Sequence, residues 1–416
     1  MSRWGILAAL SLIRFSFGYQ FQSMAALAPV ISRELALDQA QAGTLIGLYW
    51  APGVLVALPG GWLAARFGDK PMVMIGGLLT VLGGLMCALG DSYAALAMGR
   101  LVAGLGGIVM NIMAVKMTTD WFAGREIGLA FDTLFGSFPL GIALGLAVQA
   151  PLAGAIGWHG VMATTAALAA LVVATNWLVY RAPQAAGQLA AEPVSRAWPQ
   201  TREIGAISIA GIGVALYNGG FLVYVSYAPM LLSSSGFGIA ETAFVLALAS
   251  ALSVLFLPLG GHIADWSGRP RAVLFASALM FSVFGALLPP IAQGHGLLAV
   301  GALAIVISAL GSMPISHMVA LPSQAMPVRS RAVGLGIFYT WFYLGAAVCP
   351  PLGGWLRFHA STRNPATFCH FVDSNQTLRR IAHIILSCPC ESGARKGRCS
   401  QNGRCIPDIE KKGGPC

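Results

Sequence analysis

Charged side chains are scarce in this sequence. Asp, Glu, Lys and Arg together make up 10% of the 416 residues, whereas soluble domains carry about 25%. The mean hydropathy is +0.73, so the chain cannot present a polar surface to water on all sides. The formal net charge of +10 does not indicate nucleic-acid binding, because the basic residues lie in short loops between apolar runs. We expect the lipid bilayer to be the solvent for most of the chain.

Motifs for nucleotide hydrolysis and for common hydrolases are also lacking. The sequence contains no G-x-x-x-x-G-K-[ST] loop, no His-Glu-x-x-His and no Gly-x-Ser-x-Gly, which build phosphate-binding, zinc-protease and serine-hydrolase sites. We therefore expect neither an enzyme nor a bound cofactor or metal. The remaining energy sources are the substrate's own gradient, a gradient of H⁺ or Na⁺, or exchange.

Long apolar runs, in contrast, are abundant. A membrane helix needs about 20 mostly apolar residues, and eleven such windows predict an all-α membrane protein. The windows cover 4–29, 42–64, 71–90, 93–115, 127–150, 159–180, 204–232, 240–264, 271–291, 296–320 and 331–357. A polar, proline-containing stretch divides them. We predict an N-terminal lobe at 1–180, a cytoplasmic linker at 181–203, a C-terminal lobe of five spans at 204–357 and a tail at 358–416.

The basic residues of the loops fall on one side of the predicted membrane. With a cytoplasmic N-terminus, the inside loops hold twelve Lys and Arg residues before the tail, and the outside loops hold only Arg33. Cytoplasmic loops of membrane proteins are enriched in Lys and Arg. The sequence therefore predicts a multi-pass protein of a cell membrane, here a bacterial inner membrane, with its N-terminus in the cytoplasm.

Two pairs of segments repeat at nearly the same offset. Residues 60–70 (GGWLAARFGDK) are similar to residues 260–270 (GGHIADWSGRP), 200 residues later. Residues 125–130 (REIGLA) are similar to residues 331–336 (RAVGLG), 206 residues later. Both copies would have the same orientation, so the sequence predicts a duplicated six-helix unit in parallel repeat.

These segments resemble the signatures of a known family. The loops after the second and eighth spans look like the G-x-L-A-D-R-x-G-R-R loops of the major facilitator superfamily, and residues 100–107 (RLVAGLGG) resemble its R-x-x-x-G-x-G pattern. The resemblance covers about residues 1–357 and is closest to the cyanate and nitrate–nitrite porters. It implies two six-helix-type lobes, here with the last helix missing, and a monomer that gives a small molecule alternating access to a central site.

The resemblance also implies gating loops in both halves. The positions that match the family pattern are Gly61, Arg66, Gly68, Asp265, Gly268 and Arg269. The first loop departs from the pattern at Ala65, where the family has an acid, and at Asp69, where it usually has a base. In the family the loop acid helps to latch the two halves together, so the departure puts the latch of the first half in question.

A charge at membrane depth is the clearest functional signal. Arg14 lies about ten residues into the first span, which is about 15 Å deep at 1.5 Å per residue and near the midplane. Ionisable side chains at this depth are costly and usually functional. Gln22 falls on the same helical face, and we predict that this face binds an anionic substrate through the fork of the guanidinium. The alternative is a buried ion pair between Arg14 and an acid of another helix.

Three further polar residues of the first half are candidates. Asp132 in the fifth span could pair with Arg14 or Arg100, or it could carry a coupling proton. Arg100 and Asn111 share a face of the fourth span with a stripe of glycines. That face is either a cavity wall that binds substrate or a surface for close helix packing.

Aromatic and amide side chains gather in the second half. Tyr217 and Tyr224 share a face of the seventh span with Asn218 beside them, and Tyr339 and Tyr343 share a face of the eleventh span. Hydroxylated rings suit a partly apolar organic anion, so we predict that these residues contact the substrate. The alternative for each of them is ordinary helix packing.

The tail differs in composition from the rest of the chain. Six of the eight cysteines lie between Cys369 and Cys416, and the longest apolar run of the tail, at 381–386, is too short to span a bilayer. The tail is either a Cys-rich metal-binding or disulfide module, or an altered end of the chain. The abrupt change and the absence of regular C-x₂-C pairs favour the altered end.

Together these features predict a secondary transporter that moves a small organic or inorganic anion by alternating access. One alternative is an efflux transporter of apolar drugs, in which the aromatic faces bind and Arg14 is structural. Another is a non-transporting product, either a truncated remnant or a membrane sensor.

Overall fold

The computed structural model describes residues 3–59, 68–122, 126–180, 199–315, 318 and 331–363, and it contains no strand in these ranges. The predicted all-α fold is confirmed. The helices are α1 Arg3–Glu34, α2 Gln39–Gly47, α3 Pro52–Val56, α5 Asp69–Leu89, α6 Tyr93–Phe122, α7 Ile127–Val179, α9 Thr201–Ser234, α10 Ile239–Ser267, α11 Pro270–Gly294, α12 Leu297–Ser312 and α14 Arg331–Arg363. Seven helices of the described residues are long and apolar enough to cross a membrane.

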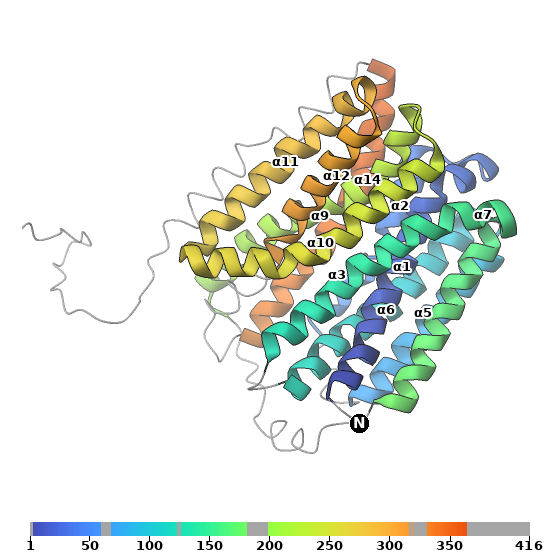
Figure 1. Ribbon diagram of the computed structural model, residues 1–416. Helices are drawn as coiled ribbons and strands as arrows, with labels where there is room; N and C mark the ends of the chain where they lie inside the picture. The colour runs from blue at the N-terminus through green and yellow to red at the C-terminus, as the bar shows by residue number, and fades with distance from the viewer. Residues whose placement is uncertain are drawn as a thin grey trace, which may run out of the picture.

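Each predicted span overlaps a helix, with two differences in detail. The fifth and sixth spans are joined in α7, which turns back on itself at Gly157 (Figure 1). The φ of Gly157 is +72°, a conformation that glycine adopts without strain. The second span is broken into α2 and α3. Pro52 opens α3 and has no N–H with which to continue the preceding helix.

The helices run alternately up and down the molecule, so their ends gather at two ends of the bundle (Figure 1). We name these the Arg3 end and the Glu34 end, after the two ends of α1. Exposed tryptophans occur near both, with Trp177 and Trp266 at the Arg3 end and Trp355 toward the Glu34 end. Tryptophan is enriched where membrane proteins meet the bilayer surface, and these residues mark two expected membrane boundaries.

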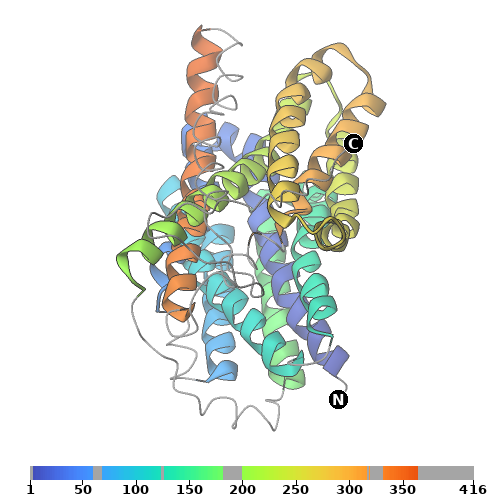
Figure 2. The same ribbon diagram turned by 90° about the vertical axis from the view of Figure 1, so that its left-hand side faces the viewer.

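Helix contacts define two lobes. In the first lobe α7 contacts α1 and α5, and in the second α9 contacts α14 while α12 contacts α10 and α11. Figure 2 shows α14 and the α11–α12 pair on different sides of the second lobe. Between the lobes, α10 lies against α7, and α14 lies against α2 and α3. Each of these two interfaces thus joins the second span of one lobe to the fifth span of the other, as expected for a duplicated unit.

The backbones of α2 and α14 touch at the Glu34 end. A Cβ atom at Gly43 would lie 2.7 Å from the carbonyl oxygen of Pro350, and one at Gly47 would overlap the carbonyl oxygen of Ala347. Gly354 of α14 meets the backbone of α2 in the same way. Small residues permit such approach between membrane helices. We name Gly43, Gly47 and Gly354 the glycine seam, which holds the two lobes together at the Glu34 end.

Candidate functional site

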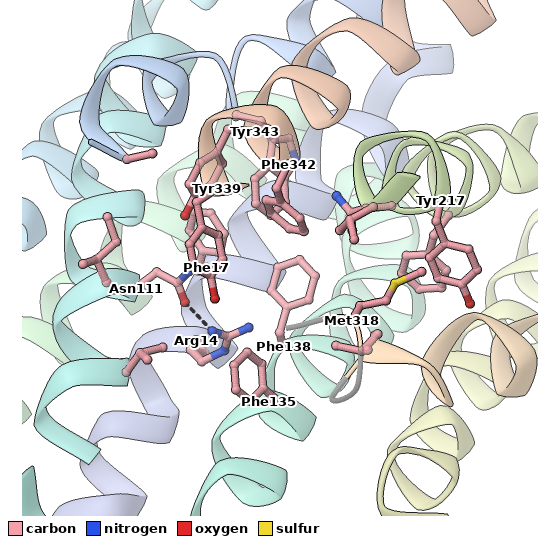
Figure 3. Close-up of a pocket in the computed structure, with 18 of the residues that line it drawn as sticks. Arg14, Phe17, Asn111, Phe135, Phe138, Tyr217, Met318, Tyr339, Phe342 and Tyr343 are labelled. Carbon is pink, nitrogen blue, oxygen red and sulfur yellow. Dashed lines mark hydrogen bonds between the residues drawn. The ribbon is translucent and has the colours of Figure 1, made fainter. Parts of the chain in front are cut away.

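A cavity of about 250 Å³ lies between the lobes. Its walls come from α1, α6 and α7 of the first lobe and from α9, α10, α12 and α14 of the second. The lining residues of α1, α6 and α14 belong to the halves of these helices nearest the Arg3 end. Figure 3 shows Arg14 and Asn111 on one side of the cavity and Tyr217 on the other. Both lobes therefore contribute to one central site.

Arg14 lies on the cavity wall with part of its guanidinium unpaired. Its Nη1 donates to the Oδ1 of Asn111 at 2.6 Å (Figure 3), and its Cζ lies 4.3 Å from the centre of the Phe135 ring. The Nε is buried without a hydrogen-bond partner. No acid in the described ranges forms a salt bridge with Arg14, so the alternative ion pair is not found in that part of the chain.

The other buried polar atoms of the wall that lack a partner are also donors. They are the indole Nε1 of Trp50 and the amide Nδ2 of Asn218. Among the described residues that line the cavity, Arg14 is the only charged one, and no buried side-chain acceptor lacks a partner. Buried donors are normally satisfied. The site therefore suits a ligand that is rich in acceptor atoms and carries a negative charge.

Aromatic rings supply the apolar walls. The ring centre of Trp50 lies 5.1 Å from that of Phe17, 6.0 Å from Phe138, 6.2 Å from Phe342 and 6.1 Å from Tyr343, distances at which rings attract one another. We name these five residues the aromatic layer. Since the glycines of α2 precede Trp50 on the way from the Glu34 end, the aromatic layer lies between the cavity and the glycine seam.

The predicted residues of the second half divide into two groups. Tyr217, Asn218, Tyr339 and Tyr343 line the cavity, although the hydroxyl of Tyr217 is already engaged, because it donates to the carbonyl of Leu310 at 2.6 Å. Tyr224 is not part of the lining. Its hydroxyl donates to the carbonyl of Ala304 at 3.3 Å within the second lobe. Contact of these residues with substrate stays a prediction.

Arg100 lies away from the cavity and is fully buried. Its Nε donates to the carbonyl of Leu45 at 3.1 Å, its Nη1 to that of Gln20 at 3.0 Å and its Nη2 to that of Phe21 at 3.3 Å. The Cζ lies 4.3 Å from the centre of the Tyr49 ring. Arg100 thus ties α6 to α1 and to the end of α2, where the second span breaks. Its partners among the described residues are backbone carbonyls and a ring, which supports the packing alternative, and contact of Arg100 with substrate stays a prediction.

Gln22 and Asp132 also lie outside the cavity lining. Gln22 is buried beside Gly145 of α7, and neither its amide oxygen nor its amide nitrogen has a partner. Asp132 is partly buried and forms no salt bridge with Arg14 or Arg100 in the described ranges. Proton coupling by Asp132 stays a prediction.

The predicted gating residues are described only in part. Gly61 and Arg66 fall outside the described residues, as does the side chain of Asp265, although its backbone belongs to α10. Gly68 and Gly268 have φ values of +78° and +61°, which favour glycine. The tail from residue 364 onward, with all its cysteines, lies outside the described residues.

The gating candidate Arg269 is exposed just before α11. Two predicted boundaries differ from the structure. Helix α9 begins at Thr201, inside the predicted linker, and α14 continues to Arg363, beyond the predicted last span.

Asp69, which departs from the family loop, has a partner in the first lobe. The Nζ of Lys116 lies 2.9 Å from a carboxylate oxygen of Asp69 and 2.8 Å from one of Asp120. The contact with Asp69 joins α5 and α6 near the Arg3 end, whereas the contact with Asp120 lies within α6. The i,i+4 spacing of Lys116 and Asp120 could have indicated their pairing, whereas the contact with Asp69 depends on how the two helices meet.

Most apolar wall residues were not predicted, and Trp50, Phe135 and Phe138 are among them. The spacing of Phe135 and Phe138 places them on one helical face, a signal that was available in the sequence. Trp50 carried no such signal, because it lies at the break between α2 and α3.

Comparison with known proteins agrees with this architecture. The 4-hydroxybenzoate transporter PcaK of Pseudomonas putida is 28% identical over 370 residues, 80% of this chain and 81% of PcaK. Monocarboxylate transporter 11 of Homo sapiens is 27% identical over 329 residues, 72% of this chain and 65% of that protein. The crystal structure of a D-xylose-proton symporter has the same fold, with a TM-score of 0.69 at 16% identity over 90% of this chain and 96% of the symporter. The profile of the Major Facilitator Superfamily matches residues 10–366. This chain therefore belongs to the Major Facilitator Superfamily, and it is a membrane transporter rather than an enzyme.

Proposed function

We propose that this chain is a secondary transporter of small organic anions that works by alternating access. The observation that carries the proposal is Arg14, which has a buried Nε without a partner and lies on the wall of the central cavity. A buried charge without a counter-ion is costly, so an anion that pairs with Arg14 is bound strongly. A guanidinium nitrogen pair matches the two oxygens of a carboxylate.

The size and lining of the cavity favour an organic acid. An engineered cavity of about 150 Å³ holds benzene, so about 250 Å³ accommodates one ring with a carboxylate. The aromatic layer offers that ring a matching wall. Two relatives are named for 4-hydroxybenzoate and for monocarboxylates, which supports the same class. The placement beside cyanate and nitrate–nitrite porters remains a prediction, and their small inorganic anions would leave most of the aromatic wall without contact.

The closed glycine seam supports an inward-facing state of the transport cycle. With the N-terminus in the cytoplasm, as the loop charges predict, the seam closes the outer side and the cavity lies toward the cytoplasm. Rocking of the lobes would part the seam and close the Arg3 end. Coupling to H⁺ or Na⁺, insertion in a bacterial inner membrane and a monomeric state remain predictions.

Uptake into proteoliposomes tests the proposal. The purified full chain is assayed with labelled benzoate, 4-hydroxybenzoate and nitrate, together with Arg14→Gln and the control Arg33→Gln, which removes an exposed arginine of the same helix. Losing one partner of a desolvated charge pair costs about 2–5 kcal/mol, so Arg14→Gln should lower kcat/KM for ring acids about 100-fold. Equal uptake by the two variants would contradict an anion site at Arg14.

The same assay separates the alternatives. An apolar drug transporter would carry neutral aromatic compounds in preference to the acids and would be little affected by Arg14→Gln. A sensor or an inactive product would show no saturable uptake of any compound.

A further inference from the structure

Asn218 is the counterpart of Arg14 in the second lobe. It lies 204 residues after Arg14, between the offsets of 200 and 206 that relate the repeated segments. Arg14 lies in α1 and Asn218 in α9, each the first helix of its lobe, and both residues line the cavity. The Nδ2 of Asn218 is buried without a partner. Each lobe therefore contributes to the cavity wall one polar residue with a buried donor that has no partner.

The charges of the two donors differ. Arg14 balances one negative charge, and no other charged side chain lies among the described residues of the wall. A second carboxylate would be desolvated opposite Asn218 without a counter-ion, which is strongly unfavourable. A neutral group at that place carries no charge and avoids this desolvation cost. The amide of asparagine both donates and accepts, so it matches a hydroxyl, which does the same.

We infer that Asn218 is a specificity-determining residue, which selects monoanionic acids with a neutral hydrogen-bonding group, such as a hydroxyl, at the end opposite the carboxylate. The inference rests on the proposed function, because it takes the carboxylate to be bound at Arg14. A substrate of this class touches both lobes at once, with its ring against the aromatic layer. An unsubstituted ring acid leaves the Nδ2 of Asn218 unpaired.

Competition for uptake tests the selection. Proteoliposomes with the full chain take up labelled benzoate, and unlabelled benzoate, 4-hydroxybenzoate and benzene-1,4-dicarboxylate compete. One net hydrogen bond corresponds to about a fivefold difference in affinity, so 4-hydroxybenzoate should compete about fivefold better than benzoate. The dicarboxylate should compete at least about tenfold worse, because its second charge is unbalanced.

Variants assign this preference to one side chain. In Asn218→Leu, which keeps the side-chain shape, the fivefold preference for the hydroxylated acid should disappear. Asn218→Ser retains a hydrogen-bonding group and should keep part of it. The matched control is Ser226→Ala, two turns along α9, which removes another buried unpartnered polar atom outside the cavity and should leave the preference intact.

The outcomes separate the role of Asn218 from the proposed function. Uptake that depends on Arg14 but shows no preference for the hydroxylated acid, or a preference that survives in Asn218→Leu, would overturn the role of Asn218 alone. Uptake of none of the three acids, or uptake independent of Arg14, would overturn the proposed function and this inference with it.

Discussion

Replacing Gly47 with alanine should weaken the closure of the lobes at the Glu34 end. The added methyl group would overlap the carbonyl oxygen of Ala347 and would lie 2.9 Å from the Cδ of Pro351. A backbone carbonyl and a proline ring cannot rotate away as a long side chain can. Overpacking of this kind costs about 1–3 kcal/mol. The cost falls only on the state in which the glycine seam is closed.

This cost corresponds to a shift of about 5- to 150-fold toward states with a parted seam. Hydrogen exchange of the protein in lipid nanodiscs measures the shift, and the amides of α2 and of the second half of α14 should exchange faster. Gly154→Ala is the control, because nothing lies within 4 Å of a Cβ at Gly154. Both changes raise helix propensity by up to about 1 kcal/mol, so their difference isolates the clash.

Two results would refute the reasoning about the seam. One is equal exchange at the seam in Gly47→Ala and Gly154→Ala. The other is faster exchange throughout the bundle, which would indicate general destabilisation of the fold instead of parting of the lobes.

Two further changes test residues inside the first lobe. Arg100→Leu removes three hydrogen bonds to carbonyls and should lower the free energy of unfolding by about 2–4 kcal/mol. Charged hydrogen bonds contribute about 1.5–3 kcal/mol each, and part of their loss is offset because the variant no longer buries a charge. An unchanged thermal unfolding midpoint in detergent would show that these bonds make no net contribution. Asp132→Asn should abolish the acceleration of uptake by an imposed proton gradient while exchange of substrate across the membrane continues, and an undiminished response to the gradient would exclude Asp132 as the proton carrier.

The helices were predictable because each needs only a local apolar run of sufficient length. Hydropathy alone did not predict the broken second span, since the residues around Pro52 are as apolar as their neighbours and hydropathy does not detect a break within an apolar run. Pro52 was a local signal for it, because proline often opens a helix at its first position.

The candidate site was predictable for residues whose cost at membrane depth is high by itself. Arg14 is such a residue, and Asn111 was found through its helical face, but their mutual hydrogen bond joins residues 97 positions apart and depends on how α1 and α6 pack. Arg100 was predicted as a possible ligand on the same grounds of charge. Its actual partners are backbone carbonyls, which every residue has, so no sequence pattern could indicate them.

Gln22 shows the limit of the helical wheel. It lies eight residues after Arg14, and at 3.6 residues per turn the two positions differ by about 80°. That angle is small enough to suggest one face and large enough to separate a cavity wall from a packed interface. The contact of Gln22 with Gly145 of α7 decides for the interface, and only the tertiary structure contains it.

The glycine seam is built from glycine, proline, carbonyl groups and the hydroxyl of Tyr227, none of which carries a charge in that form. Its strength rests on shape and dispersion forces, which neither ionic strength nor acidity alters. A closure made of ion pairs would loosen in concentrated salt and would respond to protonation. If this end lies on the outside, as the loop charges predict, we expect the outer gate to stay equally tight in media of different salinity or pH, and we expect the trigger for opening it to come from the substrate side of the aromatic layer.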